Sequence, residues 1–510
     1  MRKLNLTYSS IEDILLIILL LFAPLALASR HTWSYCIVAI ISLVIFNLYF
    51  LCHPERAKRA EGSSKLLNVL KTPISIGLLA FLLINLLYMI PLPAQIIKLL
   101  SPSAYNLRET YMLDPGKWQT LSVYPRATVE YMIKIISYIM VFLVVVSKIF
   151  QNPEYRAKSP EQNDHRSLVA GHSSCYSFIL LGALSSVLAI LFHSLCDFNM
   201  HIPANALYFM VILAIVTGLS YRESKQRTIN YSFVNKLVNS IIIIGFIIAV
   251  FGIIQKLSYN GKIYWLIDIP GGHFGPYINH DHYAGYMGMC TLLAISQLMV
   301  KIVDSSLPRI KRLKDKIVWF SSPEANKTLV YLFMAVVMTA ALFLTTSRGG
   351  IMSFIAALAV FCFMCIIGVS RRKRKRLLLV FILTIVLMII MILWVGPEET
   401  VNRFKVLNKV VRFFIREKAI LSELRPHMWK DTFGLVKDFP VFGVGLGNYS
   451  YVFPKYRTFI YHARLLRYAH NDYLQLISEM GIFGVMFIAG FFIWYFRRFR
   501  ECLHRLKEMR

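Results

Sequence analysis

Long apolar runs separated by short basic segments make up most of the chain. Runs of roughly 18 to 22 apolar residues are long enough to cross the hydrocarbon core of a bilayer as α-helices. They predict about twelve membrane spans, near residues 11–28, 33–52, 73–92, 128–147, 176–195, 204–219, 237–256, 280–300, 328–346, 350–369, 377–396 and 473–496. We therefore expect an all-α polytopic membrane protein, with residues 1–510 forming a single integral membrane domain.

Composition supports the same class. Of the 510 residues, 57% are hydrophobic and 16% are charged, whereas a soluble domain has about 45–50% apolar and about 25% charged residues. A net charge of +29 would suggest nucleic-acid binding in a soluble chain. Here the basic residues cluster between the spans, as topology determinants do, so we expect no nucleic-acid partner.

The basic residues are concentrated in alternate connections between spans. These connections are 53–72, 148–175, 220–236, 301–327 and 371–376, and further arginines follow the last span. With a cytoplasmic N-terminus and about twelve spans, all of them fall on one face of the membrane. The positive-inside rule makes that face cytoplasmic, so both termini are expected there.

The opposite face holds the other connections, including the long loop 397–472 before the last span. This loop is also basic, but long loops translocate largely regardless of their charge. Its alternating apolar and basic residues predict amphipathic helices on the membrane surface.

Two arginines lie on this opposite face. Arg348 belongs to the turn TTSRGG at 345–350, and Arg425 belongs to LRPHMW at 424–429, where a helix is predicted to start. An arginine at membrane depth costs about 2.5–3.5 kcal/mol, which favours an anionic partner, although Arg348 could also reach lipid head groups. Downstream, the glycines of 440–448 could present backbone N–H groups to an anion.

His470 is the candidate base, because a histidine can accept a proton near neutral pH. On a helix that begins there, Asp472, Gln475 and Glu479 form one polar stripe. The alternative is a histidine that anchors the span at the membrane interface.

A second polar group is found between residues 271 and 285, where His273, His280, Asp281 and His282 invite a metal-site interpretation. His280 and His282 do not share a helix face, however, and no H-x-x-x-H spacing supports a metal. We therefore predict no metal and no cofactor, and favour polar contacts to a substrate at a helix start. A third polar turn, residues 193–205, emerges on the same face.

These groups together suggest one chemistry. Two arginines can bind pyrophosphate oxygens with forked, charge-assisted hydrogen bonds. A neutral histidine nearby could deprotonate an acceptor hydroxyl, and the arginines could stabilise the leaving group in place of a metal.

Several motifs resemble the family of O-antigen ligases and O-antigen polymerases. The resemblance covers roughly residues 240–496 and rests on SRGG at 347–350, Arg425 with Trp429, the segment 440–448, and HNDYLQ at 470–475 followed by Glu479 and Gly481. It implies a GT-C-like bundle of about twelve spans in the bacterial inner membrane, with a long periplasmic loop before a late helix.

The resemblance also implies the reaction. Such enzymes of lipopolysaccharide and polysaccharide biosynthesis are glycosyltransferases that move a glycan from undecaprenyl pyrophosphate to lipid A–core or another glycan acceptor, at the periplasmic face among membrane lipids and without a metal. By motif match, Arg348 and Arg425 would bind the pyrophosphate and His470 would activate the acceptor. The expected substrate-binding residues are Asn279, His282, Asn471 and Asp472.

One segment departs from the family pattern. A stretch like 193–205 is expected after the His-Asn-Asp motif, near the C-terminus, but here it lies between the fifth and sixth predicted spans. The sequence offers no physical account of this order.

Rival functions remain open. Ligase, polymerase and protein O-oligosaccharyltransferase differ only in their acceptor, which the sequence does not name. A transporter or flippase of a lipid-linked glycan would need ionisable residues near the middle of several spans. The charges lie at one membrane face instead, which favours an enzyme.

Overall fold

The computed structural model describes most of the chain. It covers residues 8–51, 61–112, 114, 116–151, 168–221, 228–269, 272–304, 322–368, 374, 382, 386, 390, 424–458 and 466–508. Almost all of the expected span 377–396, and the amphipathic helices expected within 397–423, lie outside the described residues.

Long apolar helices dominate the described ranges, which confirms an all-α multi-pass membrane protein. Within them, nine helices are long and apolar enough to cross a membrane. They are α2 (Thr32–Phe50), α8 (Pro125–Ile149), α10 (Leu168–His193), α11 (Pro203–Ser220), α12 (Tyr231–Leu257), α13 (His280–Asp304), α15 (Pro323–Leu344), α16 (Arg348–Gly368) and α22 (Ile482–Glu508).

Two further helices occupy positions where spans were predicted. They are α1 (Tyr8–Leu25) and the shorter α5 (Pro73–Leu87). A short helix, α4 (Glu61–Leu70), precedes α5. A two-residue ladder pairs β3 (Phe150–Gln151) with β4 (Thr228–Ile229), between the end of α8 and the start of α12.

Helices α10, α11 and α13 form the centre of the bundle. They are apolar all round, and nearly all their side chains are buried. Small residues let α10 and α13 approach closely, because a Cβ on Gly182 would lie 2.2 Å from Cβ of Ser296. Ser186 adds a hydrogen bond from its Oγ to the carbonyl oxygen of Met289, at 2.8 Å.

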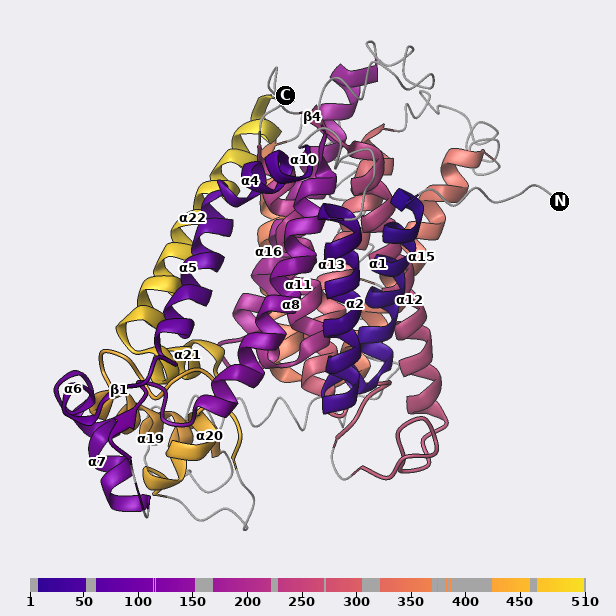
Figure 1. The fold of residues 1–510 in the computed structure, drawn as a ribbon. Helices are drawn as coiled ribbons and strands as arrows, with labels where there is room; N and C mark the ends of the chain where they lie inside the picture. Colours follow the sequence, from indigo (N-terminus) through magenta and orange to yellow (C-terminus); the bar gives the residue numbers. More distant parts are fainter. Residues whose placement is uncertain are drawn as a thin grey trace.

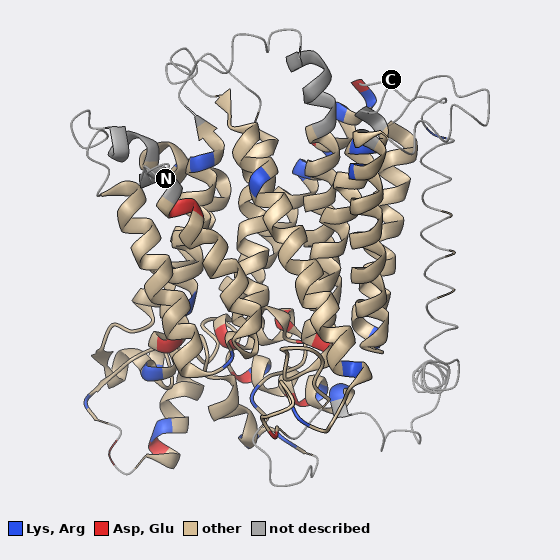
Figure 2. Cartoon of the chain, turned by 90° about the vertical axis from the view of Figure 1, so that its right-hand side faces the viewer, with Lys and Arg blue, Asp and Glu red and all other residues tan. Residues whose placement is uncertain are grey.

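The two ends of the bundle differ. The start of α1 and the end of α22 lie at one end, while α19, α20 and α21 lie at the other (Figure 1). Charged positions gather mostly toward these two ends and leave the middle of the helices apolar (Figure 2). Helix α22 lies beside α5 at one edge of the bundle, where the Phe81 and Phe487 rings contact each other with centroids 5.0 Å apart.

Two loops distant in sequence build one polar layer beneath the bundle. The first contributes α6 (Ala94–Leu100), α7 (Pro102–Tyr111) and the ladder of β1 (Leu92–Pro93) with β2 (Trp118–Gln119). The second contributes α19 (Leu424–Asp438), α20 (Tyr449–Val452) and the turn Phe453–Lys455.

Hydrogen bonds join the two loops. Val123 N donates to the carbonyl oxygen of Val444 at 3.0 Å, and Thr128 Oγ1 donates to that of Leu446 at 2.8 Å. The loop 88–124 therefore holds the second loop in place beneath the membrane helices.

The last predicted span is wrong as a single helix. The structure divides it into α21 (Asp472–Met480) and α22 at Gly481, whose φ of 58° and ψ of −134° suit only glycine. A Cβ on Gly481 would lie 2.4 Å from the carbonyl oxygen of Val441. The candidate helix-mouth stripe therefore belongs to a short helix of its own.

Candidate functional site

The displaced segment 193–205 lies beside the His-Asn-Asp motif in space. The carbonyl oxygen of Ser194 accepts from Asp472 N at 2.9 Å, and that of Leu195 accepts from Asn471 Nδ2 at 3.0 Å. Tyr473 donates its hydroxyl to the carbonyl oxygen of Leu191 at 2.8 Å. The connection between α10 and α11 thus meets α21 although the two are far apart in the sequence.

This contact pairs His470 with Asp197. Nδ1 of His470 lies 3.3 Å from Oδ1 of Asp197, whose side chain is 1% exposed, while that of His470 is 29% exposed. His470 has a left-handed φ of 50°, and its ring meets the ring of Phe198 edge-on with centroids 4.7 Å apart. Backbone and neighbours together fix the direction of the imidazole.

Asp197 has a second histidine neighbour. Its Oδ2 lies 3.2 Å from Nδ1 of His282, which is also buried. Burial alone would raise the pKa of Asp197, but the charge of His282 and the hydrogen bonds with His282 and His470 outweigh it. The pKa of Asp197 is therefore held well below its usual range, so this buried carboxyl is an anion at neutral pH.

The Asp197 carboxylate sets the tautomer of His470. A carboxylate accepts hydrogen bonds only, so Nδ1 of His470 carries the proton in the neutral ring. The lone pair then lies on Nε2, on a side chain that remains partly exposed. This arrangement suits a general base that takes a proton from a bound hydroxyl.

Arg425 and the Ser347–Arg348 turn meet at a second carboxylate, Asp281. Nη2 of Arg425 lies 3.4 Å from Oδ2 of Asp281, and Ser347 Oγ donates to Oδ1 at 2.5 Å. Arg348 follows directly as the half-buried first residue of α16. The structure therefore brings the two arginine-bearing motifs to the start of α13.

The two carboxylate clusters are neighbours. Asp281 of the arginine cluster and His282 of the His470 cluster are consecutive residues of α13. His193, at the end of α10, lies near both charges, because it interacts electrostatically with Asp197 and Asp281.

Two glycines allow this close approach. A Cβ on Gly349 would lie 2.7 Å from Sγ of Cys196, and one on Gly350 would lie 2.4 Å from Cβ of Ala284. The glycines that follow Arg348 thus let α16 pack directly against the segment that carries Asp197.

The predicted substrate-binding residues lie at this end of the bundle and have partners in the protein. Asn279 Oδ1 accepts from Asp281 N at 2.9 Å, and Asn471 Oδ1 caps α21 by accepting from Leu474 N at 3.0 Å. Asp472 binds His201 Nδ1 at 2.8 Å and Met200 N at 3.1 Å. Their role in substrate binding stays a prediction, beside a structural role that the geometry supplies.

The glycines of 440–448 bind an anion from the protein itself. Gly447 N donates to Oε2 of Glu479 at 2.9 Å, and Tyr449 N donates to Oε1 at 3.3 Å. Gln475 Nε2 donates to the same Oε1 at 3.1 Å. Burial raises the pKa of Glu479. The expectation that these N–H groups receive a ligand is thus corrected for Gly447 and Tyr449, which hold α21 instead.

The histidines around residue 280 point to different partners. His280 Nδ1 lies 2.8 Å from the carbonyl oxygen of Gly272, whereas His282 faces Asp197. In the part of the chain that the structure describes, no three His, Cys, Asp or Glu side chains form a group that could hold a metal ion. Metal independence of the reaction remains a prediction.

Sequence reasoning named the segments that carry Asp197 and Asp281 but gave neither aspartate a role. Both are acidic residues at the mouth of an apolar helix, which is the signal that could have identified them. Their partners could not be found in this way, because His470, Ser347 and Arg425 come from remote segments.

Comparison with known proteins supports the resemblance seen in the motifs. A family model described as O-antigen ligase matches residues 333–489, which include Arg348, Arg425 and His470. The segment 193–205 lies outside the match. No similar curated protein and no similar solved structure was found. On the matched segment 333–489, the chain belongs to the O-antigen ligase family.

Proposed function

We propose that this protein transfers a glycan from undecaprenyl pyrophosphate to an acceptor hydroxyl, with inversion at the anomeric carbon. The observation that carries the proposal is the pair of adjacent clusters, Asp197 with His470 and Asp281 with Arg425, in a chain of this family. The first cluster offers a base and the second offers cations, which are the two parts that such a transfer needs.

His470 acts as the base in this proposal. The acceptor hydroxyl gives its proton to Nε2 while its oxygen forms a bond to the anomeric carbon. Asp197 is a positioning residue, because it holds Nδ1 and stabilises the imidazolium that forms. The proton stays on His470 until water or the departing pyrophosphate takes it.

The arginines stabilise the leaving group. The bond between the anomeric carbon and the pyrophosphate oxygen breaks, and its electron pair leaves on the pyrophosphate. Arg425 contacts Asp281 through one nitrogen at 3.4 Å, and a guanidinium has five N–H donors to share with phosphate oxygens. Arg348 adds its charge at the N-terminus of α16, where the helix dipole also favours an anion.

The site is proposed to face the periplasm of a bacterium, with both termini in the cytoplasm. The basic connections support this orientation by the positive-inside rule. The clusters lie at the end of the bundle opposite the start of α1 and the end of α22 (Figure 1).

Reconstitution tests the proposal. The purified protein is supplied in proteoliposomes with a polyprenyl-pyrophosphate glycan and candidate acceptors, and products are identified by mass. Transfer is expected for the wild type and for His504→Ala, whose side chain is 68% exposed, but not for His470→Ala. Full activity of His470→Ala would refute the proposed base.

The acceptor in the product separates the members of the family. Transfer to lipid A–core indicates a ligase, and transfer to a second lipid-linked glycan indicates a polymerase. Transfer to a protein indicates an oligosaccharyltransferase. Movement of the lipid-linked glycan across the membrane without a covalent product would instead indicate a flippase.

A further inference from the structure

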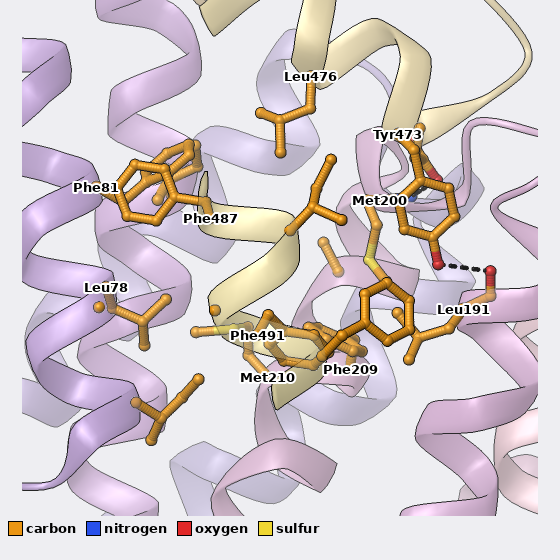
Figure 3. Close-up of a pocket in the computed structure, with 18 of the residues that line it drawn as sticks. Leu78, Phe81, Leu191, Met200, Phe209, Met210, Tyr473, Leu476, Phe487 and Phe491 are labelled. Atoms are coloured by element: carbon orange, nitrogen blue, oxygen red, sulfur yellow. Dashed lines mark hydrogen bonds between the residues drawn. The ribbon is translucent and has the colours of Figure 1, made fainter. Parts of the chain in front are cut away.

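A long apolar groove opens between the bundle and its outermost helices. It has a volume of about 590 Å³ and is lined by α5, α8, α11 and α22. Figure 3 shows Leu78 and Phe81 on one wall, Phe209 and Met210 on another, and Phe487 and Phe491 of α22 along it. The residues of α22 that line it run from Met486 to Arg498, roughly 18 Å at 1.5 Å per residue. This length suits a hydrocarbon chain lying in one leaflet.

One end of the groove is polar and belongs to the site region. His201, Asp472 and Glu479 line it there, and Arg497 and Arg498 line the far end. A ligand with an apolar chain in the groove would therefore present its head group near α21.

Lys134 supplies a cation along this groove. It lies within the membrane helix α8 and lines the cavity. Its Nζ lies 4.6 Å from the ring centroid of Tyr35 and 4.7 Å from that of Tyr131. No ion pair of Lys134 is found among the described residues, and the nearby Glu130 pairs with Arg126 at 3.6 Å. A lysine on a membrane helix is costly unless an anion accompanies it.

A chain of aromatic rings joins Lys134 to the candidate base. Tyr131 lies 5.7 Å from His201 and His201 lies 5.0 Å from Tyr468, measured between ring centroids. Phe198 then stacks on Tyr468 at 4.3 Å and meets His470. A head group bound at Lys134 therefore lies along the same wall as His470.

The arginine cluster favours a different groove for the donor. Arg348, Asp281 and Arg425 do not line the groove of Lys134. A second apolar cleft of about 590 Å³, lined by α10, α16 and α22, includes Trp429, one helical turn after Arg425. A prenyl chain there would leave its pyrophosphate next to the arginines.

We propose that the groove of Lys134 binds the lipid anchor of the acceptor, and that Lys134 binds a phosphate near the head of this lipid. The inference rests on the proposed transfer and narrows its acceptor to a phosphorylated, membrane-anchored glycolipid. The donor and acceptor would enter on opposite sides of α21 and meet at His470.

Two glycines allow the groove to be filled without disturbing the protein. A Cβ on Gly77 or on Gly490 meets no atom within 4 Å, and both residues line the groove. Gly77→Phe and Gly490→Phe should occupy it. Ile247→Phe is the matched control, because Ile247 is exposed on α12 outside the groove. Lys134→Met and Lys134→Arg separate the charge from the length of the side chain.

The assay compares one acceptor sugar in two forms, attached to a phosphorylated diacyl glycolipid and free in water. The groove-filling variants and Lys134→Met should raise KM for the glycolipid by at least about tenfold, as expected for loss of a charge-assisted contact. KM for the free sugar and for the donor should not change, and Lys134→Arg should restore most of the effect. Unchanged KM values throughout would overturn the proposal, as would a rise in the donor's KM with both acceptors.

A separate binding measurement covers failure of the reaction itself. If the wild type transfers to neither form, the proposed function fails, and retention of the same glycolipid is then measured by native mass spectrometry. Retention by the wild type and Ile247→Phe, with loss in Gly77→Phe, Gly490→Phe and Lys134→Met, would support the groove as a phospholipid-type site. Equal retention by all variants would overturn it.

Discussion

Asp197 is an anion shared by two histidines and almost hidden from solvent. Its charge therefore acts on His282 and His470 rather than on water. An asparagine at this position would keep the size of the side chain but could donate to Nδ1, which favours the wrong tautomer of His470.

Asp197→Asn is accordingly expected to lower kcat by about 10²- to 10⁴-fold with little change in KM. Transfer kinetics in proteoliposomes measure this split. Asp431→Asn is the control, because Asp431 is a buried carboxylate that accepts from Thr458 instead. Equal losses in kcat for both variants would show that Asp197 acts only through folding.

The lowered pKa of Asp197 also predicts a pH dependence of stability. A carboxyl whose pKa is lower in the folded than in the unfolded state stabilises the fold above its unfolded value, about 3.9. This contribution is lost as the pH falls through the folded-state pKa. Thermal unfolding in detergent should therefore show the wild type losing its advantage over Asp197→Asn only in the acidic range. A constant difference from pH 7 to pH 3 would contradict the assignment.

Single residues were only partly predictable. His470, Arg348 and Arg425 stand out because charged or titratable side chains are rare at membrane helix ends. The local contacts of Asn279 and Asn471 follow from the cap preference of asparagine. The pairing of Asp197 with His470 depends on the packing of two remote segments, which residue type alone does not specify.

Elements meet in this protein through glycines that permit close contact. The best case is the start of α16 against the segment that carries Asp197. Gly349→Ala should push Cys196 and the backbone around it away, because its Cβ would lie 2.7 Å from the sulfur. Activity should fall while the protein still inserts into the membrane.

Gly288→Ala is the matched control. It is also a helical glycine, on α13, but its Cβ would meet only Leu342 Cδ1, at 3.7 Å, an ordinary contact. Alanine should be tolerated there and should favour the helix by about 0.5–1 kcal/mol. Equal activity of the two alanine variants would refute the close-contact argument.

Helix α21 is held by one buried carboxylate. Glu479 accepts hydrogen bonds from Gly447 N, Tyr449 N and Gln475 Nε2. In Glu479→Gln, an amide N–H would face one of these donors, so the free energy of unfolding should fall by about 1–3 kcal/mol. Chemical denaturation measures the loss.

The exposed Glu130 offers a comparison for Glu479. Its side chain is 53% exposed and pairs only with Arg126 among its described ion pairs. Glu130→Gln should change the free energy of unfolding by no more than about 0.5 kcal/mol. A similar loss in both variants would show that burial of the carboxylate is not the cause.

The pattern of the elements explains why the last span was predicted as one helix. Residues 472–480 have helical polar periodicity, and residues 482–496 are apolar, so the two read as a continuous helix with a polar start. Gly481 is compatible with a helix interior at a modest cost. Only the nearby carbonyl oxygen of Val441 makes a glycine with positive φ necessary there.

At the scale of the whole molecule, orientation in the membrane is directly testable. In a background without the eight native cysteines, Tyr451→Cys and His504→Cys place exposed thiols at opposite ends of the bundle. A membrane-impermeant maleimide added to intact cells with a permeabilised outer membrane should label the first and not the second. The reverse pattern would place the site in the cytoplasm.

The architecture was largely predictable because bilayer thickness dictates the length of apolar runs. The positive-inside rule further predicts which connections share a face. Helix order within the bundle was not predictable, because apolar helices offer lipid and protein similar surfaces. Small residues such as Gly182 and Ser186 decide their neighbours only when the facing residues are known.

The position of the α10–α11 connection has a consequence for biogenesis. During synthesis, Asp197 enters the membrane region long before His470 and meets His282 of α13 first. The buried charge is thus compensated by the growing protein itself, without waiting for the last helices. His470 arrives only with α21, so the cell makes a stable scaffold first and a reactive centre last.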